Sequence, residues 1–295
     1  MLSREKTKDL YAPIVEYVQT SGDLGPMRQL ATTDLFFLLV YILDRKDVDN
    51  DWLYARCNEV QAAPDDHLDL WAREHYKSTL VTFAMSIMEI LKDPEITIGI
   101  FPHTKPIARA FLRQIKYELE TNGQLKTLFP DILWTNPKKD AFNDGATWSE
   151  EKVITVKRQI NPKEATIEAN GLVDGMPTSK HYSLLIYDDV VTLESVTTPE
   201  MMLKPTDALA LSYNLGAHGG RRRFIGTRYH FNDTYATLIE RGTVTPRLHP
   251  ATEDGSMEGK PVFLEQEKLN EKRRDMGPYI FACQMLQNPR ADSAQ

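Results

Sequence analysis

The sequence predicts an α/β fold with a mainly parallel sheet, and two observations carry this expectation. Short apolar runs typical of strands alternate along the chain with longer segments in which apolar residues recur at helical spacing. Several of the short runs end directly in polar residues, at the strand ends where parallel α/β sheets bind ligands. A chain of 295 residues is long enough for one large domain of this class, or for a core with a small appendage.

The first half of the chain begins with helices and then alternates. Residues 5–54 read as helical, with a helix start expected at Thr33 before a thick apolar run. Next come expected strands at 68–72 and 96–101 and expected helices at 78–91 and 106–122, the last ended by Asn122-Gly123. Residues 138–150 are polar and are expected to form a loop.

The second half continues the alternation. Strands are expected at 153–158, 165–169, 182–187 and 223–227. Helices are expected at 199–215, at 233–241 and from about Leu264 onward, after a glycine-rich loop. No internal repeat interrupts this pattern, so the chain reads as one alternating α/β arrangement rather than as a solenoid.

The composition excludes several protein classes. Hydrophobic residues make up 41% and charged residues 26% of the chain, which is ordinary for a globular protein. With 35 basic and 42 acidic residues the formal net charge is −7, which disfavours a uniformly basic nucleic-acid coat but permits a local basic patch. Cys57 and Cys283 are expected to be reduced thiols of a cytosolic protein. No apolar run reaches the roughly 18 residues of a membrane span, so no membrane partner is expected.

The first candidate site is the turn between the expected strand 68–72 and the expected helix 78–91. It reads Arg73-Glu74-His75-Tyr76-Lys77-Ser78-Thr79. Backbone amides at such a turn hold phosphates, a lysine bridges the outer phosphates of a nucleoside triphosphate, and the next hydroxyl ligates Mg²⁺. Lys77 and Ser78 have these positions, whereas Glu74 and Tyr76 stand where glycines normally relieve crowding. The plainer interpretation is a helix N-cap followed by solvated side chains.

The second candidate is the acidic pair Asp188-Asp189, which ends the apolar run of residues 182–187. A carboxylate at a strand end can hold Mg²⁺ through water, and a second one can polarise an attacking water. The plainer interpretation is an acidic, solvated turn.

The third candidate is Gly226-Thr227-Arg228, at the end of an apolar strand and before a polar turn into a helix. Thr227 or Arg228 can stand near a γ-phosphate in this position. The plainer interpretation is a structural strand with solvated surface arginines, of which Arg221, Arg222 and Arg223 are examples.

Together these segments resemble the ATPase half of the large terminase subunit of tailed bacteriophages, over residues 53–289. Residues 72–79 are similar to its variant Walker A motif, and residues 184–189 to its Walker B motif. Residues 224–230, followed by Asp233, are similar to its coupling motif and are the most specific of the three. Residues 281–289 resemble the junction at which the ATPase half gives way to a nuclease domain.

The resemblance implies a three-layer P-loop NTPase core of the ASCE/RecA-like kind. The core is expected at residues 51–242, after an N-terminal helical segment (1–50) and before a small lid or linker (243–295) that leads toward a missing nuclease domain. Nucleotide contacts are implied for the loop, and Gly226, Thr227 and Arg228 are implied to couple hydrolysis to movement. The residues expected to contact the nucleotide are Arg73, Glu74, His75, Tyr76, Lys77, Ser78 and Thr79.

Individual roles follow from the same resemblance. Lys77 is implied to bind the β- and γ-phosphates of ATP, and Ser78 and Asp188 to serve Mg²⁺. Asp189 takes the place of the catalytic glutamate with a side chain one methylene shorter, and Arg73 matches an arginine that senses the γ-phosphate. Catalysis is therefore expected to depend on Asp189, Lys77 and Arg73.

The implied activity is a molecular motor that moves double-stranded viral DNA into a procapsid, in the cytoplasm of the infected bacterial host. Its implied partners are the viral DNA, the portal protein, the small terminase subunit and further copies of the chain in a homo-oligomeric ring. A neighbouring copy is expected to supply an arginine in trans. Lys180 and His181 stand where that arginine is often found, which leaves Arg158 and the run Arg221 to Arg223 as alternatives. Nuclease activity is expected only in a longer protein.

Two other functions remain open from the sequence. One is a different P-loop helicase or translocase, which a duplex-unwinding assay distinguishes. The other is a nucleotide-insensitive assembly or DNA-binding module whose loop has decayed, which Lys77→Ala distinguishes because such a module has no ATPase activity to lose. The net charge of −7 favours the motor over a dedicated DNA binder, because non-specific DNA binding relies on Lys and Arg contacts to phosphates.

Overall fold

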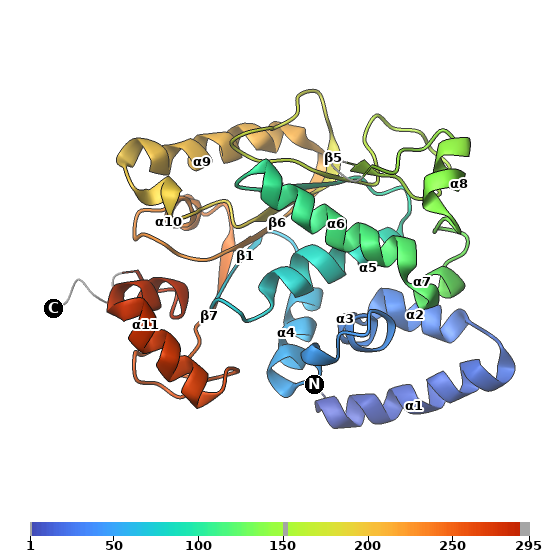
Figure 1. Ribbon diagram of the computed structural model, residues 1–295, viewed down its shortest axis with the longest axis horizontal. Helices are drawn as coiled ribbons and strands as arrows, with labels where there is room; N and C mark the ends of the chain where they lie inside the picture. Colours follow the sequence, from blue (N-terminus) through green and yellow to red (C-terminus); the bar gives the residue numbers. More distant parts are fainter. Residues whose placement is uncertain (1, 150–152, 290–295) are drawn as a thin grey trace. The chain divides into compact units, whose positions relative to one another are not determined.

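Seven strands form one sheet in the order β3-β4-β2-β5-β6-β1-β7 in a computed structural model of the chain (Figure 1). The structure describes residues 2–149 and 153–289. The pairs β2–β5, β5–β6, β6–β1 and β1–β7 are parallel, and the pair β3–β4 is antiparallel. The predicted α/β fold with a mainly parallel sheet is therefore confirmed.

The chain forms two compact units, each assembled from segments that are distant in the sequence. The first comprises Met1–Ala63, Thr79–Thr97 and Phe111–Glu168, and the second comprises Pro64–Ser78, Ile98–Ala110 and Ala169–Gln295. The three-part division expected from the sequence stays a prediction, and residues 290–295 of its last part lie outside the described residues.

The first unit is largely helical, as predicted for residues 5–54. Its elements are α1 (Arg4–Ser21), α2 (Gly25–Thr33), α3 (Leu35–Phe37), the π-helix η1 (Leu38–Ile42), η2 (Lys46–Val48), α4 (Asp51–Ala62), the π-helix η3 (Thr79–Ala84), α5 (Met85–Lys92), α7 (Gly123–Leu128), α8 (Pro137–Asn143) and β3 (Val153–Ile154). Helix α6 (Lys105–Thr121) and strand β4 (Ile167–Ala169) contribute residues to both units. The helix start expected at Thr33 is wrong by one residue, because the Asp34 carboxylate caps the new helix by accepting from the Phe37 amide at 3.0 Å.

One further prediction in this unit is wrong. The expected loop 138–150 contains α8, which has a proline in its first turn, where the missing amide costs no hydrogen bond. Helix α6 ends before Asn122, as predicted, and the Asn122 side chain also caps α7 by accepting from the Leu125 amide at 3.0 Å. The strands expected at 153–158 and 165–169 are present but shorter, as β3 and β4.

The second unit contains the parallel strands that position the site. Its elements are β1 (His67–Trp71), β2 (Ile98–Pro102), β5 (Tyr182–Asp188), η4 (Glu194–Val196), α9 (Pro199–Ser212), η5 (Tyr213–Leu215), β6 (Gly216–Gly226), α10 (Thr234–Glu240), β7 (Thr245–His249) and α11 (Gln266–Gln284). The strands expected at 68–72, 96–101 and 182–187 are confirmed. Strand β6 begins well before the predicted 223–227, and the sequence pattern did not predict β7.

Parallel pairing brings the polar strand ends of this unit to one edge. Along β6, Ile225 pairs with Asp188 of β5, and Gly226 pairs with Leu70 of β1. Strand β6 thus lies between β1 and β5, and the three carboxyl ends are level. The core below this edge is aromatic, with the rings of Tyr187 and Phe224 stacked 5.1 Å apart. Among the described residues, no helix is long and apolar enough to cross a membrane.

Candidate functional site

Lys77 lies at the carboxyl edge of the second unit, at the start of the helical segment after β1. Its ammonium is buried and donates to Oγ1 of Thr227 at 2.8 Å, with the Trp71 carbonyl oxygen 3.4 Å away. Burial lowers the pKa of this lysine, while the carboxylates of Asp189 and Asp188 act in the opposite direction. A buried cation beside two acidic residues is well placed to receive an anionic ligand that completes its partners.

Ser78 connects the turn formed by residues 73–77, here called the lysine loop, to the acidic pair Asp188-Asp189. Its hydroxyl donates to Oδ1 of Asp188 at 3.1 Å, although the two residues are 110 positions apart. Asp188 is fully buried at the last position of β5. The two segments that the sequence singled out independently therefore meet through a hydrogen bond.

Asp189 follows directly and has one unsatisfied oxygen. Its backbone is left-handed, with φ of 51°, and its amide donates to the Ile225 carbonyl at 2.9 Å. Its Oδ1 is buried and has no hydrogen-bond partner in the structure. Buried carboxylate oxygens are normally paired, so this atom is a candidate to contact a water or ligand bound at the edge.

The oxygens of Ser78 and Asp188 fit a nucleotide-bound Mg²⁺. Residues 2–149 and 153–289 hold no cluster of three or more His, Cys, Asp or Glu side chains that could bind a metal ion alone. Mg²⁺ in nucleotide sites usually takes only one or two protein ligands and completes its shell with phosphates and waters. A hydroxyl and a carboxylate already in contact provide such a partial set.

The backbone of the lysine loop has the shape that glycines usually give. Glu74 and Tyr76, the two positions where glycine is expected, both have left-handed backbones, with φ of 63° and 66°. An L-residue with a Cβ pays roughly 1–2 kcal/mol for this conformation. The side chains at these two positions therefore raise the conformational energy of the loop relative to glycine.

The loop side chains that replace or flank the glycines turn toward the C-terminal part of the unit. Glu74 Oε1 forms an ion pair with Lys272 Nζ of α11 at 2.7 Å, and the Tyr76 ring meets Phe263 edge-on at 5.7 Å. His75 is buried, also against Phe263, and burial lowers its pKa to about 4. His75 is accordingly neutral and buried near pH 7. The last residue of the candidate segment, Thr79, is the first residue of η3.

Arg73 contacts the turn that follows β6. Its guanidinium donates to the Tyr229 hydroxyl and lies over the same ring, 5.7 Å from the centroid. Its amide donates to the Gln284 carbonyl at 3.1 Å. The arginine therefore stands between the lysine loop and the turn, while its side chain remains exposed.

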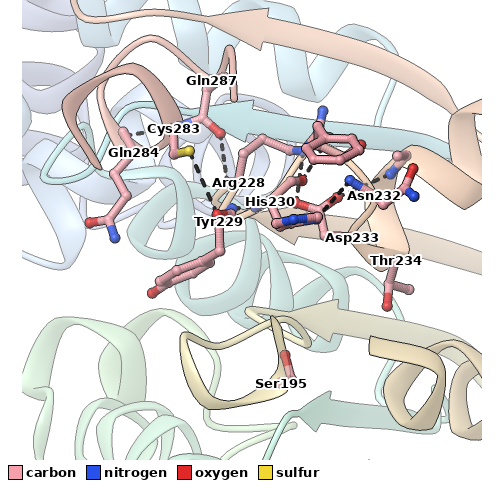
Figure 2. Close-up of polar contacts among 12 residues, drawn as sticks. Ser195, Arg228, Tyr229, His230, Asn232, Asp233, Thr234, Cys283, Gln284 and Gln287 are labelled. Carbon is pink, nitrogen blue, oxygen red and sulfur yellow. Dashed lines mark hydrogen bonds and ion pairs between the residues drawn. The ribbon is translucent and has the colours of Figure 1, made fainter. Parts of the chain in front are cut away.

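The turn after β6 separates the roles of Thr227 and Arg228. Thr227 is buried and is the residue that meets Lys77. Arg228 closes the turn instead (Figure 2): its Nε donates to Asp233 Oδ2 at 2.9 Å, and its Nη2 donates to the His230 carbonyl at 3.2 Å. Of the two residues considered for the γ-phosphate, Thr227 is the one at the lysine.

The end of α11 holds the same turn from the other side, as Figure 2 shows. Gln287 accepts from the Arg228 amide through Oε1 at 3.1 Å and donates through Nε2 to the Gln284 carbonyl at 2.9 Å. The Cys283 thiol lies 3.6 Å from the Tyr229 carbonyl. Sequence reasoning did not single out Gln284, Gln287 or Lys272 as site residues, because no local pattern marks which distant backbone a helix end will meet.

Gly226 ends β6 where no side chain fits. A Cβ at this position would lie 2.2 Å from Cζ and 2.3 Å from the hydroxyl oxygen of Tyr235. The glycine is therefore required for the approach of α10 to the strand end.

The arginines considered for action in trans are engaged elsewhere. Arg223 is buried, and its Nε forms an ion pair with Asp65 Oδ1 at 3.0 Å. The Nε of Arg222 lies 3.6 Å from Asp66 Oδ1. Asp65 and Asp66 directly precede β1. Arg221 lies 3.6 Å from Asp65 as well. Arg158, in the first unit, donates to the Glu164 carbonyl at 2.8 Å.

Comparison with known protein families finds no family model that matches this chain, and comparison with curated proteins finds no significant match.

Proposed function

We propose that this chain is the ATP-hydrolysing motor domain of a viral DNA-packaging terminase, built on an ASCE/RecA-like P-loop core. The strand order supports the proposal, because β6 lies between the strand of the lysine loop and the strand of the acidic pair, as the additional strand of the ASCE arrangement does. The left-handed backbones of Glu74 and Tyr76 support it as well, since glycine, which the resembled loop has at these positions, is the residue that favours this backbone.

One observation carries the proposal: the lysine loop contacts both other candidate segments. Lys77 bonds to Thr227 at 2.8 Å, and Ser78 bonds to Asp188 at 3.1 Å. Three segments chosen for three separate chemical reasons thus converge at the carboxyl edge of one parallel sheet, where α/β proteins bind ligands.

Each residue then has a chemical task. Lys77 and the amides of its loop bind the outer phosphates of ATP, and the buried site strengthens this electrostatic contact. Ser78 and Asp188 would hold Mg²⁺, which when bound neutralises charge on the phosphate oxygens. Asp189 orients the attacking water and accepts its proton through a carboxylate oxygen.

The motor is proposed to work on double-stranded DNA in a ring of identical chains. A neighbouring copy would contribute an arginine to the transferred phosphate, an addition worth orders of magnitude in rate. A single chain is therefore expected to hydrolyse ATP slowly.

The test is Mg²⁺-dependent phosphate release from ATP, with and without linear double-stranded DNA. Wild type is expected to turn over, and Lys77→Ala to lose on the order of 100-fold in rate, because it removes a preorganised charge at the phosphates. Lys204→Ala, at an exposed lysine of α9, is the matched control and is expected to retain full activity.

Titration calorimetry with a non-hydrolysable ATP analogue separates failed binding from failed chemistry. Wild type that neither binds the analogue at high micromolar concentration nor releases phosphate would make the chain a nucleotide-insensitive module. Strand separation in an unwinding assay would instead favour a helicase.

A further inference from the structure

Tyr235 lies at the end of β6, the strand that pairs with β5 and its acidic end. It lies in the first turn of α10, is 1% exposed, and packs so closely on Gly226 that no Cβ fits between them. The packing fixes the ring and therefore the place of its hydroxyl at the ends of β5 and β6. A tyrosine held this tightly presents its hydroxyl in one position only.

The Tyr235 hydroxyl is buried and has no hydrogen-bond partner of ordinary geometry. It lies beside the backbone of Val191 without forming a bond of normal geometry. Oδ1 of Asp189 is the other buried atom here that lacks a partner. Both groups lie at the end of β6: the Tyr235 ring packs on Gly226, and the Asp189 amide donates to the carbonyl of the preceding residue, Ile225, at 2.9 Å. The Asp189 carboxylate also raises the pKa of Tyr235, second to burial itself.

A structural role does not explain the hydroxyl. A buried hydroxyl without a partner costs stability, and phenylalanine would fill the same space without that cost. The Tyr235 hydroxyl is a buried donor, and Asp189 Oδ1 is a buried acceptor near the same strand end. Such a pair is expected in a site whose hydrogen bonds form only when a ligand binds. Catalytic hydrogen bonds are often long in ligand-free structures and tighten in the reacting complex.

We propose that Tyr235 is a positioning residue for Asp189: in the nucleotide-bound state its hydroxyl donates a hydrogen bond to Oδ1 and thereby orients the carboxylate toward the attacking water. This inference rests on the proposed ATPase function. It also answers the difficulty of the shorter side chain, because an aspartate fixed from behind can hold one direction without the reach of a glutamate.

The test compares Tyr235→Phe with wild type in ATP turnover and in thermal unfolding without nucleotide. The variant is expected to lose about tenfold in kcat, the value of one hydrogen bond to a charged group, with KM for ATP unchanged within about twofold. Its unfolding temperature is expected to be equal or higher. A purely structural tyrosine would show the opposite pattern, with a lower unfolding temperature and an unchanged kcat.

The matched control is Tyr213→Phe. The Tyr213 hydroxyl is also buried without a hydrogen-bond partner, but its ring lies under Arg222, 4.6 Å from the guanidinium carbon. This variant is expected to keep kcat. In an Asp189→Asn background, adding Tyr235→Phe is expected to cause no further loss of the residual rate, because the hydroxyl acts through that carboxylate.

The outcomes separate this inference from the proposed function. If wild type turns over ATP and Lys77→Ala does not, while Tyr235→Phe keeps kcat within about twofold, the role of Tyr235 is overturned and the ATPase stands. A full additional loss in the Asp189→Asn background also overturns it. If wild type neither binds nor hydrolyses ATP, both fall together.

Discussion

At the scale of single residues, the lysine loop shows what replaces a glycine. Glu74 and Tyr76 hold left-handed backbones, and each has a partner from the C-terminal part of the second unit, Lys272 and Phe263 respectively. The partners offset part of the conformational cost that a Cβ brings in this region. The loop is thus kept in shape by tertiary contacts rather than by local sequence.

Replacing Glu74 separates the backbone cost from the charge. Glu74→Ala and Glu74→Gly both remove the ion pair, which is worth about 0–1 kcal/mol for a half-exposed pair. Because only the glycine variant lacks a Cβ, it alone relieves the left-handed backbone, and it should exceed the alanine variant by about 1 kcal/mol in free energy of unfolding. Urea titration of the two variants gives this difference, and equal stabilities would contradict the strained loop.

Both variants should also bind an ATP analogue more tightly than wild type. Each removes a negative charge next to an anion site, and the gain is expected to be shared by alanine and glycine because it is electrostatic. Calorimetry at low and high salt checks this, since a charge effect at an exposed residue shrinks with salt.

At the scale of elements, the turn after β6 is organised by a single carboxylate. Asp233 is fully buried, bonds to Arg228, and caps α10 by accepting from the Ala236 amide at 3.1 Å. One side chain thus fixes where the strand ends, how the turn closes and where the next helix begins. Thr227 is held at Lys77 by the same arrangement.

Removing that carboxylate is expected to loosen the turn. Asp233→Ala leaves the nearly buried Arg228 without its counter-charge and should lower the free energy of unfolding by about 3–5 kcal/mol. Asp233→Asn keeps the cap and should cost less. Chemical denaturation measures both, with the exposed Asp207→Asn of α9 as a control expected within about 0.5 kcal/mol of wild type.

Local patterns predicted most elements, and tertiary contacts explain the rest. Strand β5 was recognisable because nearly every residue in it is apolar and buried. The first half of β6 contains Ala217, His218 and three glycines, so its strand state depends on the sheet around it rather than on propensity. The polar helix α8 was missed because a proline start and few apolar residues resemble a loop.

The same division holds in the site. Lys77, Ser78 and Asp188 could be proposed from residue type and position next to a strand end, and the structure brings them together. The partners from α11 could not, because the contacts of Lys272 and Gln287 depend on how a distant helix packs. The sequence therefore predicts the residue types that carry the chemistry more readily than it predicts the distant residues that support them.

At the scale of the whole molecule, acid is expected to destabilise the fold partly through His75. The pKa of this buried histidine is lowered to about 4 in the folded chain, whereas an unfolded histidine titrates near 6.5. Between these values the unfolded state binds a proton that the folded state does not, so stability falls as the pH falls through this window. Above about pH 6.5 the histidine contributes no penalty.

Replacing the histidine should flatten this dependence. Between about pH 7.5 and pH 5, the free energy of unfolding of wild type is expected to fall by about 2 kcal/mol more than that of His75→Asn, because asparagine at position 75 does not titrate in this range. Urea unfolding at the two pH values gives the comparison, and equal losses in both proteins would contradict a neutral, buried His75.

The two glutamines at the end of α11 set a minimum length for the working polypeptide. The Gln284 carbonyl accepts the Arg73 amide, and the Gln287 side chain accepts the Arg228 amide. A chain cut before Gln284 would retain every residue of the lysine loop and the acidic pair, yet two amides of the candidate site would lose these acceptors. Tags, fusion partners and truncation endpoints therefore belong beyond Gln287, and activity lost on shortening would report missing support rather than missing chemistry.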